Sequence, residues 1–310
     1  MPLRDAVVGA ACGALLSVLV SHVVAPALQR RRERAALLAS ASASASVSSS
    51  SSSSTCPRGK VFLVGAGPGD LGLLTVRAQQ LLRVATVLVV DDLVARDALS
   101  PLLARDCEVA YVGKRGGKAD STPQTDIDAL LVARCRAGAL VVRLKGGDPM
   151  VFGRVFSEIR ALVQTRCAFE VVPGISSALA APAAAHIPIT HKTESRSFLV
   201  VSLHKPDEMD FALLAQIETL VVLMATRTLR TVAERLVAHG RAPETPVALV
   251  HNGTLPTQVT LRGTLADIAE RASGRSYSPA IIVIGTVAKY AELSEYVEPD
   301  DADETDDATV

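Results

Sequence analysis

The sequence contains no tryptophan, and aromatic residues make up only 3% of its 310 residues. A hydrophobic core therefore has to be built from aliphatic side chains, and with 49% hydrophobic residues the chain has ample material for one. A length of this order suffices for one large or two ordinary domains. There is also no excess of charge, because 32 Lys and Arg balance 32 Asp and Glu. This balance gives no support to a nucleic-acid-binding protein, which usually carries a basic surface.

Closely spaced cysteines are absent as well. The five cysteines are odd in number and widely separated, and no Cys-X-X-Cys pair occurs. Such a pattern predicts neither a disulfide framework nor a zinc site. We interpret the cysteines as reduced thiols of an intracellular protein and expect no bound metal.

The most apolar part of the chain is its beginning. Ala6 to Leu28 is interrupted only by mild polar residues, and the basic cluster Arg30 to Arg34 follows directly. A helix of this length would span roughly 35 Å, enough for the hydrocarbon core of a bilayer of about 30 Å. The basic residues then favour a cytosolic location for the rest of the chain. We predict an N-terminal apolar helix that anchors the protein in a membrane; the alternative is a plastid or mitochondrial transit peptide, because the segment is rich in Ser, Ala and Arg.

Composition divides the chain into four parts. Residues 1–58 hold the anchor or targeting segment and an Ala/Ser-rich linker that cannot form a core. Two α/β domains are expected at 59–174 and 175–292. Residues 293–310 are strongly acidic and are predicted to be a disordered tail.

Short apolar strands alternate with helical segments after Gly59. Strands are predicted at 61–64, 86–90, 108–112, 139–144 and 170–172, with helices at 73–84 and 126–136. This alternation indicates a mostly parallel sheet with helices on both faces. Further strands at 197–203, 219–224, 246–251, 257–262 and 279–285, with helices at 228–239 and 264–271, predict the second α/β domain.

Several predicted strands end in turns suited to ligand binding. The stretch at 141–154 is VVRLKGGDPMVFGR, in which Gly146 and Gly147 let the backbone approach a ligand and Pro149 stiffens the turn. Other strands end in GAGPGD at 65–70, GKR at 113–115, PGISS at 173–177 and HNGT at 251–254. Open α/β sheets bind ligands beyond the carboxyl ends of their strands, so we expect these turns to line one crevice.

The GAGPGD turn also resembles a dinucleotide fingerprint. It lies between a predicted strand and a predicted helix, and Asp91 follows about twenty residues later, where a ribose-binding acid is expected. Against this, Asp70 stands at the third glycine position and Pro68 stiffens the turn. An NAD-binding or non-catalytic α/β protein therefore stays as an alternative.

The motifs GAGPGD, YVGKR, TPQ, VVRLKGGDPMVFGR, VVPGISSA and IPITH, in this order, closely resemble the tetrapyrrole methylase family, and within it the uroporphyrinogen-III C-methyltransferases, over about residues 59–290. The resemblance implies two α/β domains with S-adenosylmethionine in a cleft between them, and a homodimer. It implies methyl transfer to C2 and C7 of uroporphyrinogen III, which gives precorrin-2 for sirohaem or cobalamin and releases S-adenosylhomocysteine. A related methylase of a later corrin precursor is an alternative.

The resemblance also assigns roles to individual residues. Asp91 and Lys114 match the family's proposed proton acceptor and donor. The substrate carries many carboxylates, so basic residues near the motif ends are candidates to bind them: Arg115, Lys145, Arg154 and Lys192. The positions that match the cofactor site are Pro68, Gly146, Gly147, Asp148, Val151, Ser176, Ser177, Met224 and Gly253.

Some positions depart from the family pattern. Val90 and Asp92 flank Asp91 where the family usually has Tyr and Arg, and Leu203 stands in place of a glycine. Val155-Phe156-Ser157-Glu158 follows FGR, where two glycines and two glutamates are usual. These departures affect the detail of substrate binding and leave the expected reaction class unchanged.

Overall fold

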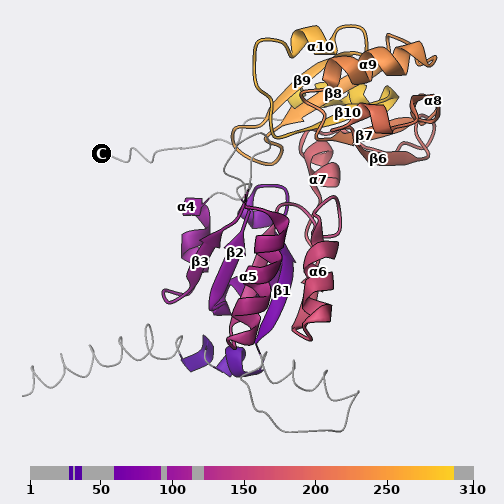
Figure 1. Ribbon diagram of the computed structural model, residues 1–310. Coiled ribbons are helices and arrows are strands. Elements are labelled where there is room, and N and C mark those ends of the chain that lie inside the picture. Colours follow the sequence, from indigo (N-terminus) through magenta and orange to yellow (C-terminus); the bar gives the residue numbers. More distant parts are fainter. Residues whose placement is uncertain (1–27, 31, 37–58, 92–95, 114–121, 297–310) are drawn as a thin grey trace, which may run out of the picture. The chain divides into compact units, whose positions relative to one another are not determined.

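The computed structural model describes residues 28–30, 32–36, 59–91, 96–113 and 122–296. These residues form two compact units (Figure 1). Among the described residues, the first contains those up to Gly67 and those between Leu71 and Gly174, and the second contains Pro68–Asp70 and those from Ile175 to Tyr296. Each unit has its own five-stranded sheet, which confirms the α/β class expected from the sequence.

The sheet of the first unit is entirely parallel. Its strand order is β3-β2-β4-β1-β5. The central strands β1 and β4 are buried along their whole length, which explains why they are continuous aliphatic runs. The strands are β1 Lys60–Gly65, β2 Val87–Val90, β3 Glu108–Tyr111, β4 Leu140–Lys145 and β5 Ala168–Val172.

Helices cover both faces of this sheet. Helix α3 (Val76–Val84) packs on one face through Ala78, Leu81 and Leu82. Helices α5 (Gln124–Arg136) and α6 (Val155–Gln164) pack on the other face and lie in front of the sheet in Figure 1. Between β2 and β3 lie α4 (Arg96–Leu99) and the 3₁₀ turn Ser100–Leu102. The layers are those of an open α/β sheet.

Helices α4, α6, α7 (Ser177–Ala184) and α8 (Phe211–Leu214) were not predicted, and α3 was predicted to begin too early. The hydroxyl of Thr75 accepts a hydrogen bond from the backbone N–H of Ala78 at 3.1 Å, so α3 begins at Val76. Leu71–Leu73 form a separate 3₁₀ turn. The GAGPGD turn therefore does not run straight into a helix, as a dinucleotide-binding turn does.

The sheet of the second unit is mixed. Its order is β6-β7-β10-β8-β9, and only β6 and β7 pair in parallel. One face is covered by α8 (Phe211–Leu214), α9 (Leu229–Ala238) and α10 (Ile268–Arg271), the other by α7 and the 3₁₀ segment Thr286–Tyr296. A further 3₁₀ turn is Pro206–Glu208. The strands are β6 Phe198–Ser202, β7 Thr219–Leu223, β8 Pro246–His251, β9 Val259–Thr264 and β10 Ala280–Ile284.

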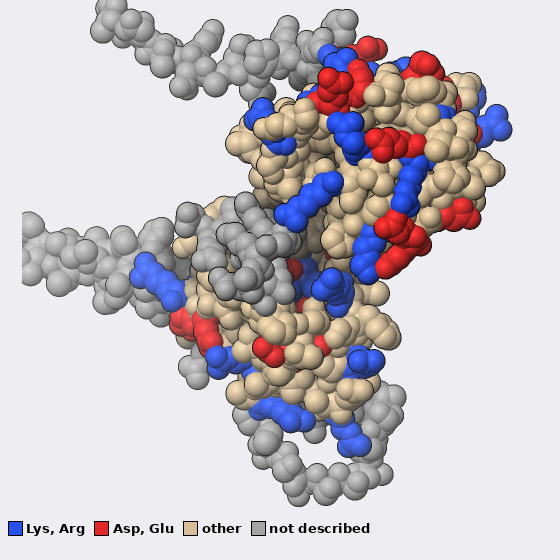
Figure 2. Space-filling model, turned by 45° about the horizontal axis from the view of Figure 1, so that its top comes forward, with Lys and Arg blue, Asp and Glu red and all other residues tan. Residues whose placement is uncertain are grey.

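Charges of both signs are intermixed on the surface of the second unit, the upper one in Figure 2. This agrees with the formal net charge of zero. No helix in the described part of the chain is long and apolar enough to cross a membrane. The predicted anchor, Ala6 to Leu28, lies outside the described residues except for its last residue, as do the linker and most of the acidic tail.

Candidate active site

The sheet order places four predicted motifs side by side in the first unit. Strands β2, β4, β1 and β5 are neighbours and run parallel, so their carboxyl ends meet at one edge of the sheet. In this order the ends carry Asp91, the GGDP turn, the GAG of the first loop and Pro173-Gly174. The topology thus brings together turns that lie far apart in the sequence, where α/β sheets bind their ligands.

The backbones of these turns approach each other closely. Gly67 and Gly147 exchange backbone hydrogen bonds, 3.2 Å from Gly67 N to Gly147 O and 2.7 Å from Gly147 N to Gly67 O. A Cβ added to Gly174 would lie 2.3 Å from the carbonyl oxygen of Gly147, which no side chain tolerates. These glycines leave the strand ends without side chains at their meeting point. The N–H and C=O groups of Gly67 and Gly147 bond to each other, so the close approach fixes the turns to one another at the edge of the sheet.

Asp148 connects two of the turns. Its Oδ1 accepts a hydrogen bond from the backbone N–H of Met150 at 2.8 Å, and its Oδ2 accepts one from the N–H of Gly174 at 3.0 Å. The carboxylate therefore joins the GGDP turn to the end of β5. The geometry thus gives Asp148 the role of fixing the two turns to each other, and its contact with the cofactor stays a prediction.

A charged network lies beneath the ends of β2 and β4. Arg143, in the middle of β4, donates from Nη2 to Asp91 Oδ1 at 2.5 Å and from Nε to Glu158 Oε1 at 3.0 Å. Lys145 donates to the same Glu158 oxygen at 2.9 Å. The side chains of Arg143, Lys145 and Glu158 are 2%, 4% and 0% exposed, whereas that of Asp91 is 25% exposed. Only Asp91 in this network presents itself to solvent.

The prediction that Lys145 binds substrate carboxylates needs correction. Arg143 and Lys145 are two residues apart on one strand and therefore point to the same face, which α6 covers with Glu158. Burial lowers the pKa of Lys145, and the neighbouring Arg143 charge lowers it further, although Glu158 acts in the opposite direction. The ammonium group is occupied inside the unit and is not directed to a ligand.

Arg143 and Glu158 are the residues that sequence reasoning missed. The available signal was a single arginine inside the aliphatic run of β4, because such a charge is buried only when it is paired. Its partner is supplied by a helix that was not predicted. The neighbour Ser157, at a position of departure from the family, donates to Asp128 Oδ2 of α5 at 2.5 Å and so joins α6 to α5.

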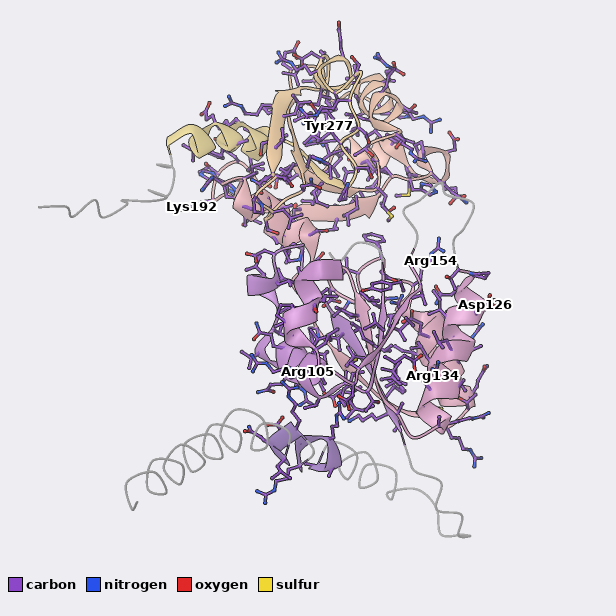
Figure 3. All side chains as sticks on the ribbon, turned by 90° about the vertical axis from the view of Figure 1, so that its left-hand side faces the viewer. Arg105, Asp126, Arg134, Arg154, Lys192 and Tyr277 are labelled. Atoms are coloured by element: carbon purple, nitrogen blue, oxygen red, sulfur yellow. The ribbon has the colours of Figure 1, made fainter. Side chains whose placement is uncertain are left out.

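Arg154 is exposed and has no hydrogen-bonding partner among the described residues. It lies at the N-cap of α6 in a left-handed conformation with φ of 52°. Figure 3 shows it at the end of the first unit away from Arg105 and Arg134. This position leaves its guanidinium available for an anionic ligand. Val151, 37% exposed, lies in the same turn region, while Lys114 and Arg115 lie outside the described residues.

The remaining predicted cofactor residues belong to the second unit. Ser176 caps α7 through a hydrogen bond from Ala178 N at 3.3 Å, and Ser177 is the first residue of that helix. A Cβ on Gly253 would lie 2.5 Å from the Cβ of Ala181, so the turn after β8 packs directly on α7. Pro68 belongs to the same unit, where the next residues contact this turn: Asp70 N donates to Thr254 Oγ1 at 3.3 Å.

Met224 and Lys192 are exposed on the second unit. Met224 follows β7 with a positive φ of 58° and is 51% exposed, so it is not the core residue that a methionine after a buried strand usually is. Leu203, the departure from a family glycine, is completely buried in the core beneath β6 and β7. Its side chain therefore fills the interior of the unit.

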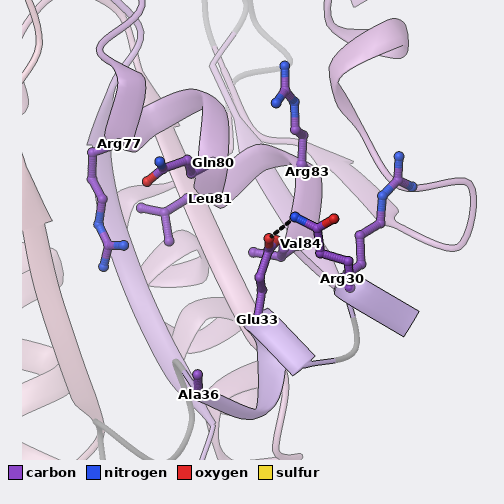
Figure 4. Close-up of a pocket in the computed structure, with 9 residues that line it drawn as sticks. Arg30, Glu33, Ala36, Arg77, Gln80, Leu81, Arg83 and Val84 are labelled. Carbon is purple, nitrogen blue, oxygen red and sulfur yellow. Dashed lines mark hydrogen bonds between the residues drawn. The ribbon is translucent and has the colours of Figure 1, made fainter. Parts of the chain in front are cut away.

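A separate pocket of about 680 Å³ lies between residues 29–36 and α3 (Figure 4). The guanidinium groups of Arg30, Arg77 and Arg83 point away from one another in Figure 4 and do not converge on one ligand. None of the predicted site residues lines this pocket. Within the described ranges, no group of three or more His, Cys, Asp or Glu side chains is arranged to hold a metal ion.

Comparison with known proteins confirms the resemblance found in the motifs. The family model for tetrapyrrole (corrin/porphyrin) methylases matches residues 60–269. The chain belongs to the tetrapyrrole methylase family. It is 48% identical over 231 residues to a uroporphyrinogen-III C-methyltransferase of Synechococcus elongatus, a match covering 74% of this chain and 94% of that protein. It is 47% identical to a siroheme synthase of Neisseria meningitidis, of which it spans about half, 48%.

Solved structures agree with this membership. The native uroporphyrin III C-methyltransferase of Thermus thermophilus matches with a TM-score of 0.64 and 37% identity, over 74% of this chain and 99% of that one. The same enzyme complexed with S-adenosyl homocysteine matches with a TM-score of 0.64 and 36% identity, over 74% of this chain and 93% of that one. The methylase fold is therefore shown by sequence and by structure.

Proposed function

We propose that this tetrapyrrole methylase transfers methyl groups from S-adenosylmethionine to C2 and C7 of uroporphyrinogen III, giving precorrin-2 for sirohaem or cobalamin synthesis. The observation that carries the proposal is the 48% identity to a uroporphyrinogen-III C-methyltransferase across 94% of that protein. The chain spans about half, 48%, of the siroheme synthase of Neisseria meningitidis, so the proposal is confined to methyl transfer.

The residues at the strand ends suit this chemistry. S-adenosylmethionine supplies an electrophilic methyl group on a sulfonium, so orientation of the attacking carbon is the main requirement. The GGDP turn is proposed to bind the cofactor, as the family resemblance implies. The other proposed cofactor residues are Pro68, Ser176, Ser177, Met224 and Gly253. Attack by a pyrrole carbon places positive charge on the ring, which the Asp91 carboxylate stabilises before it accepts the proton. Arg154 and Lys192 are exposed and are proposed to bind substrate carboxylates.

The direct test is incubation of the full chain with uroporphyrinogen III and S-adenosylmethionine labelled in the methyl group. We expect two labelled methyl groups per tetrapyrrole, identified by mass spectrometry and by the spectrum of the oxidised product. Label in a later corrin precursor and not in uroporphyrinogen III would favour the related methylases of that pathway. An unlabelled tetrapyrrole in every case would contradict the proposal.

Two features of the assembly are proposed from the sequence and the family. We propose that the active form is a homodimer, which light scattering of the purified chain tests. We also propose that Ala6 to Leu28 attaches the protein to a membrane with the catalytic units on the cytosolic side. Extraction of full-length protein with alkaline carbonate should leave it in the membrane fraction, whereas a shortened mature chain inside an organelle would support a transit peptide.

A further inference from the structure

Arg143 calls for an explanation beyond packing. It is an arginine in the middle of a strand that is buried along its whole length, and its side chain is only 2% exposed. Removing a guanidinium from water is unfavourable. A well-packed aliphatic residue at such a buried position would therefore give the more stable fold. Since an arginine is nevertheless buried here, its hydrogen-bond partners indicate its function.

The guanidinium bridges two carboxylates in different parts of the unit. Nη2 donates to Asp91 Oδ1 at the end of β2, and Nε donates to Glu158 Oε1 on α6. Nη1 donates to the carbonyl oxygens of Val89 and Leu144 at 3.4 and 3.2 Å. Every nitrogen is engaged, so the guanidinium plane is fixed relative to both strands.

One oxygen of Asp91 is held by Arg143, and the side chain as a whole is 25% exposed. Its Oδ1 accepts from Arg143, while Oδ2 accepts no hydrogen bond from the described residues. The backbone N–H of Asp91 donates to Leu144 O at 3.4 Å, which ties the same residue to β4. A carboxylate with one fixed and one accessible oxygen has the geometry of an oriented proton acceptor.

Lys145 and Glu158 complete the arrangement. Two cations and two anions make the network neutral, and Lys145 contacts Glu158 at 2.9 Å. A lysine at position 143 would keep this neutrality, but a single ammonium group lacks the planar fork that reaches both carboxylates. The bridging function, and not the charge, is therefore specific to arginine.

We propose that Arg143 is a positioning residue for methyl transfer: it fixes the Asp91 carboxylate at the end of β2 so that its exposed oxygen takes the proton released from the tetrapyrrole. This inference rests on the proposed function. In the proton-transfer step, the methylated ring carbon has no hydrogen to lose, so a C–H bond of the methylene bridge next to that ring breaks. Its electron pair forms a double bond to the ring and neutralises the positive charge, and the proton forms an O–H bond with Asp91. Arg143 acts through Asp91 and has no contact with substrate of its own.

The test is a double-mutant cycle in the full chain, using Arg143→Lys, Asp91→Asn and the double variant. We expect Asp91→Asn to lower kcat about 100-fold and Arg143→Lys about tenfold, the magnitudes typical of a lost and of a misplaced general base. The double variant should match Asp91→Asn alone, because Arg143 has nothing left to position. Binding of S-adenosylhomocysteine should change less than about twofold in all three.

Arg134→Lys is the matched control. Arg134 of α5 pairs with Glu108 of β3 at 2.5 Å in the same unit, and the two side chains are 40% and 49% exposed, far more than that of Arg143. This variant should leave kcat and cofactor binding unchanged. If the effects of Arg143→Lys and Asp91→Asn multiply in the double variant, or if Arg143→Lys leaves kcat unchanged, the positioning role is overturned. Failure of the proposed function is distinguishable, since the wild-type chain would then label no tetrapyrrole at all.

Discussion

At the scale of single residues, Glu158 is the member of the charged network on which the fold depends most. It is fully buried, and its Oε1 accepts from both Arg143 and Lys145. In Glu158→Gln, Asp91 is the one carboxylate of this network left to balance the buried charges of Arg143 and Lys145. Because an uncompensated buried charge typically costs about 3 kcal/mol or more, we expect a loss of this size in the free energy of unfolding, measured with urea.

Glu208→Gln is the control for Glu158→Gln. Glu208 pairs with Lys205 at 2.7 Å, and both side chains are about two thirds exposed, 66% and 65%. Exposed pairs of this kind contribute at most about 1 kcal/mol. Equal effects of the two substitutions would show that the buried network does not stabilise the unit.

The thiol of Cys135 provides a second prediction at this scale. Burial raises its pKa to about 12, and the hydrogen bond and charge of Cys167 add to the effect. The folded pKa exceeds the ordinary thiol value of 9.0, so the stability that the neutral thiol contributes is complete below pH 9 and declines as pH rises from 9 toward about 12. We expect Cys135 not to react with a disulfide reagent at pH 8 until the chain unfolds.

Thiol counting in the folded and urea-unfolded chain measures this. Cys135→Ala should lower the number of thiols released on unfolding by one and leave the number that react in the folded protein unchanged. Labelling of Cys135 at the same rate in both states would mean that the interior beneath α5 is open to solvent.

At the scale of elements, the contact between the ends of β4 and β5 is tight enough to test. In Gly174→Ala the new Cβ would lie 2.3 Å from Gly147 O, so the two turns must separate. We expect a loss of about 1–3 kcal/mol in stability, as for other overpacked positions. Affinity for S-adenosylhomocysteine should fall about tenfold or more, because the displaced turn is the proposed cofactor cradle. Calorimetric titration measures the affinity.

Gly240→Ala is the comparison that separates clash from backbone strain. Gly240 has a positive φ of 93°, but no atom lies within 4 Å of a Cβ built there. Strain alone should lower stability by about 1 kcal/mol and leave cofactor affinity unchanged. A similar loss of affinity in both variants would show that the ends of β4 and β5 do not form the binding site.

The elements also show what the sequence could predict. All ten strands were predicted to within a few residues, because buried strands are bounded apolar runs. Helices α6 and α7 were missed for different reasons, the start of α6 and the composition of α7. The N-cap of α6 is Arg154 in a left-handed conformation without a side-chain cap. Helix α7 is SALAAPAA, with a proline inside and no polar face.

At the scale of the whole molecule, the order of the strands in each sheet could not be predicted from the sequence. Strand β1 pairs with β4 and β5, which follow it by 75 or more residues, and no local signal specifies those partners. The same holds for Arg143: the register that pairs Val89 with Arg143 is what brings its guanidinium to Asp91. The motifs predicted the site's chemistry, whereas the buried side chains that support it emerge only from the pairing of distant strands.

The N-terminal residues can be separated from catalysis at this scale. Arg34 donates from Nε to Val84 O at 2.6 Å and from Nη2 to Ala85 O at 3.1 Å, and it pairs with Asp106 at 3.2 Å. Its hydrogen bond to Asp106 is the main cause that lowers the pKa of that carboxyl. These contacts cap the end of α3, where β1, β2 and β4 have their amino ends, opposite the edge that carries Asp91 and GGDP.

Removal of residues 1–56 should therefore leave kcat for methyl transfer within about twofold of the full chain, since every described candidate residue follows Gly59. Stability should fall by about 1 kcal/mol, because the carbonyl groups at the end of α3 lose their charged partner. Arg34→Ala in the full chain should reproduce that loss of stability while kcat stays unchanged. A tenfold fall in kcat on truncation, not reproduced by Arg34→Ala, would instead mean that residues before Gly59 take part in the reaction.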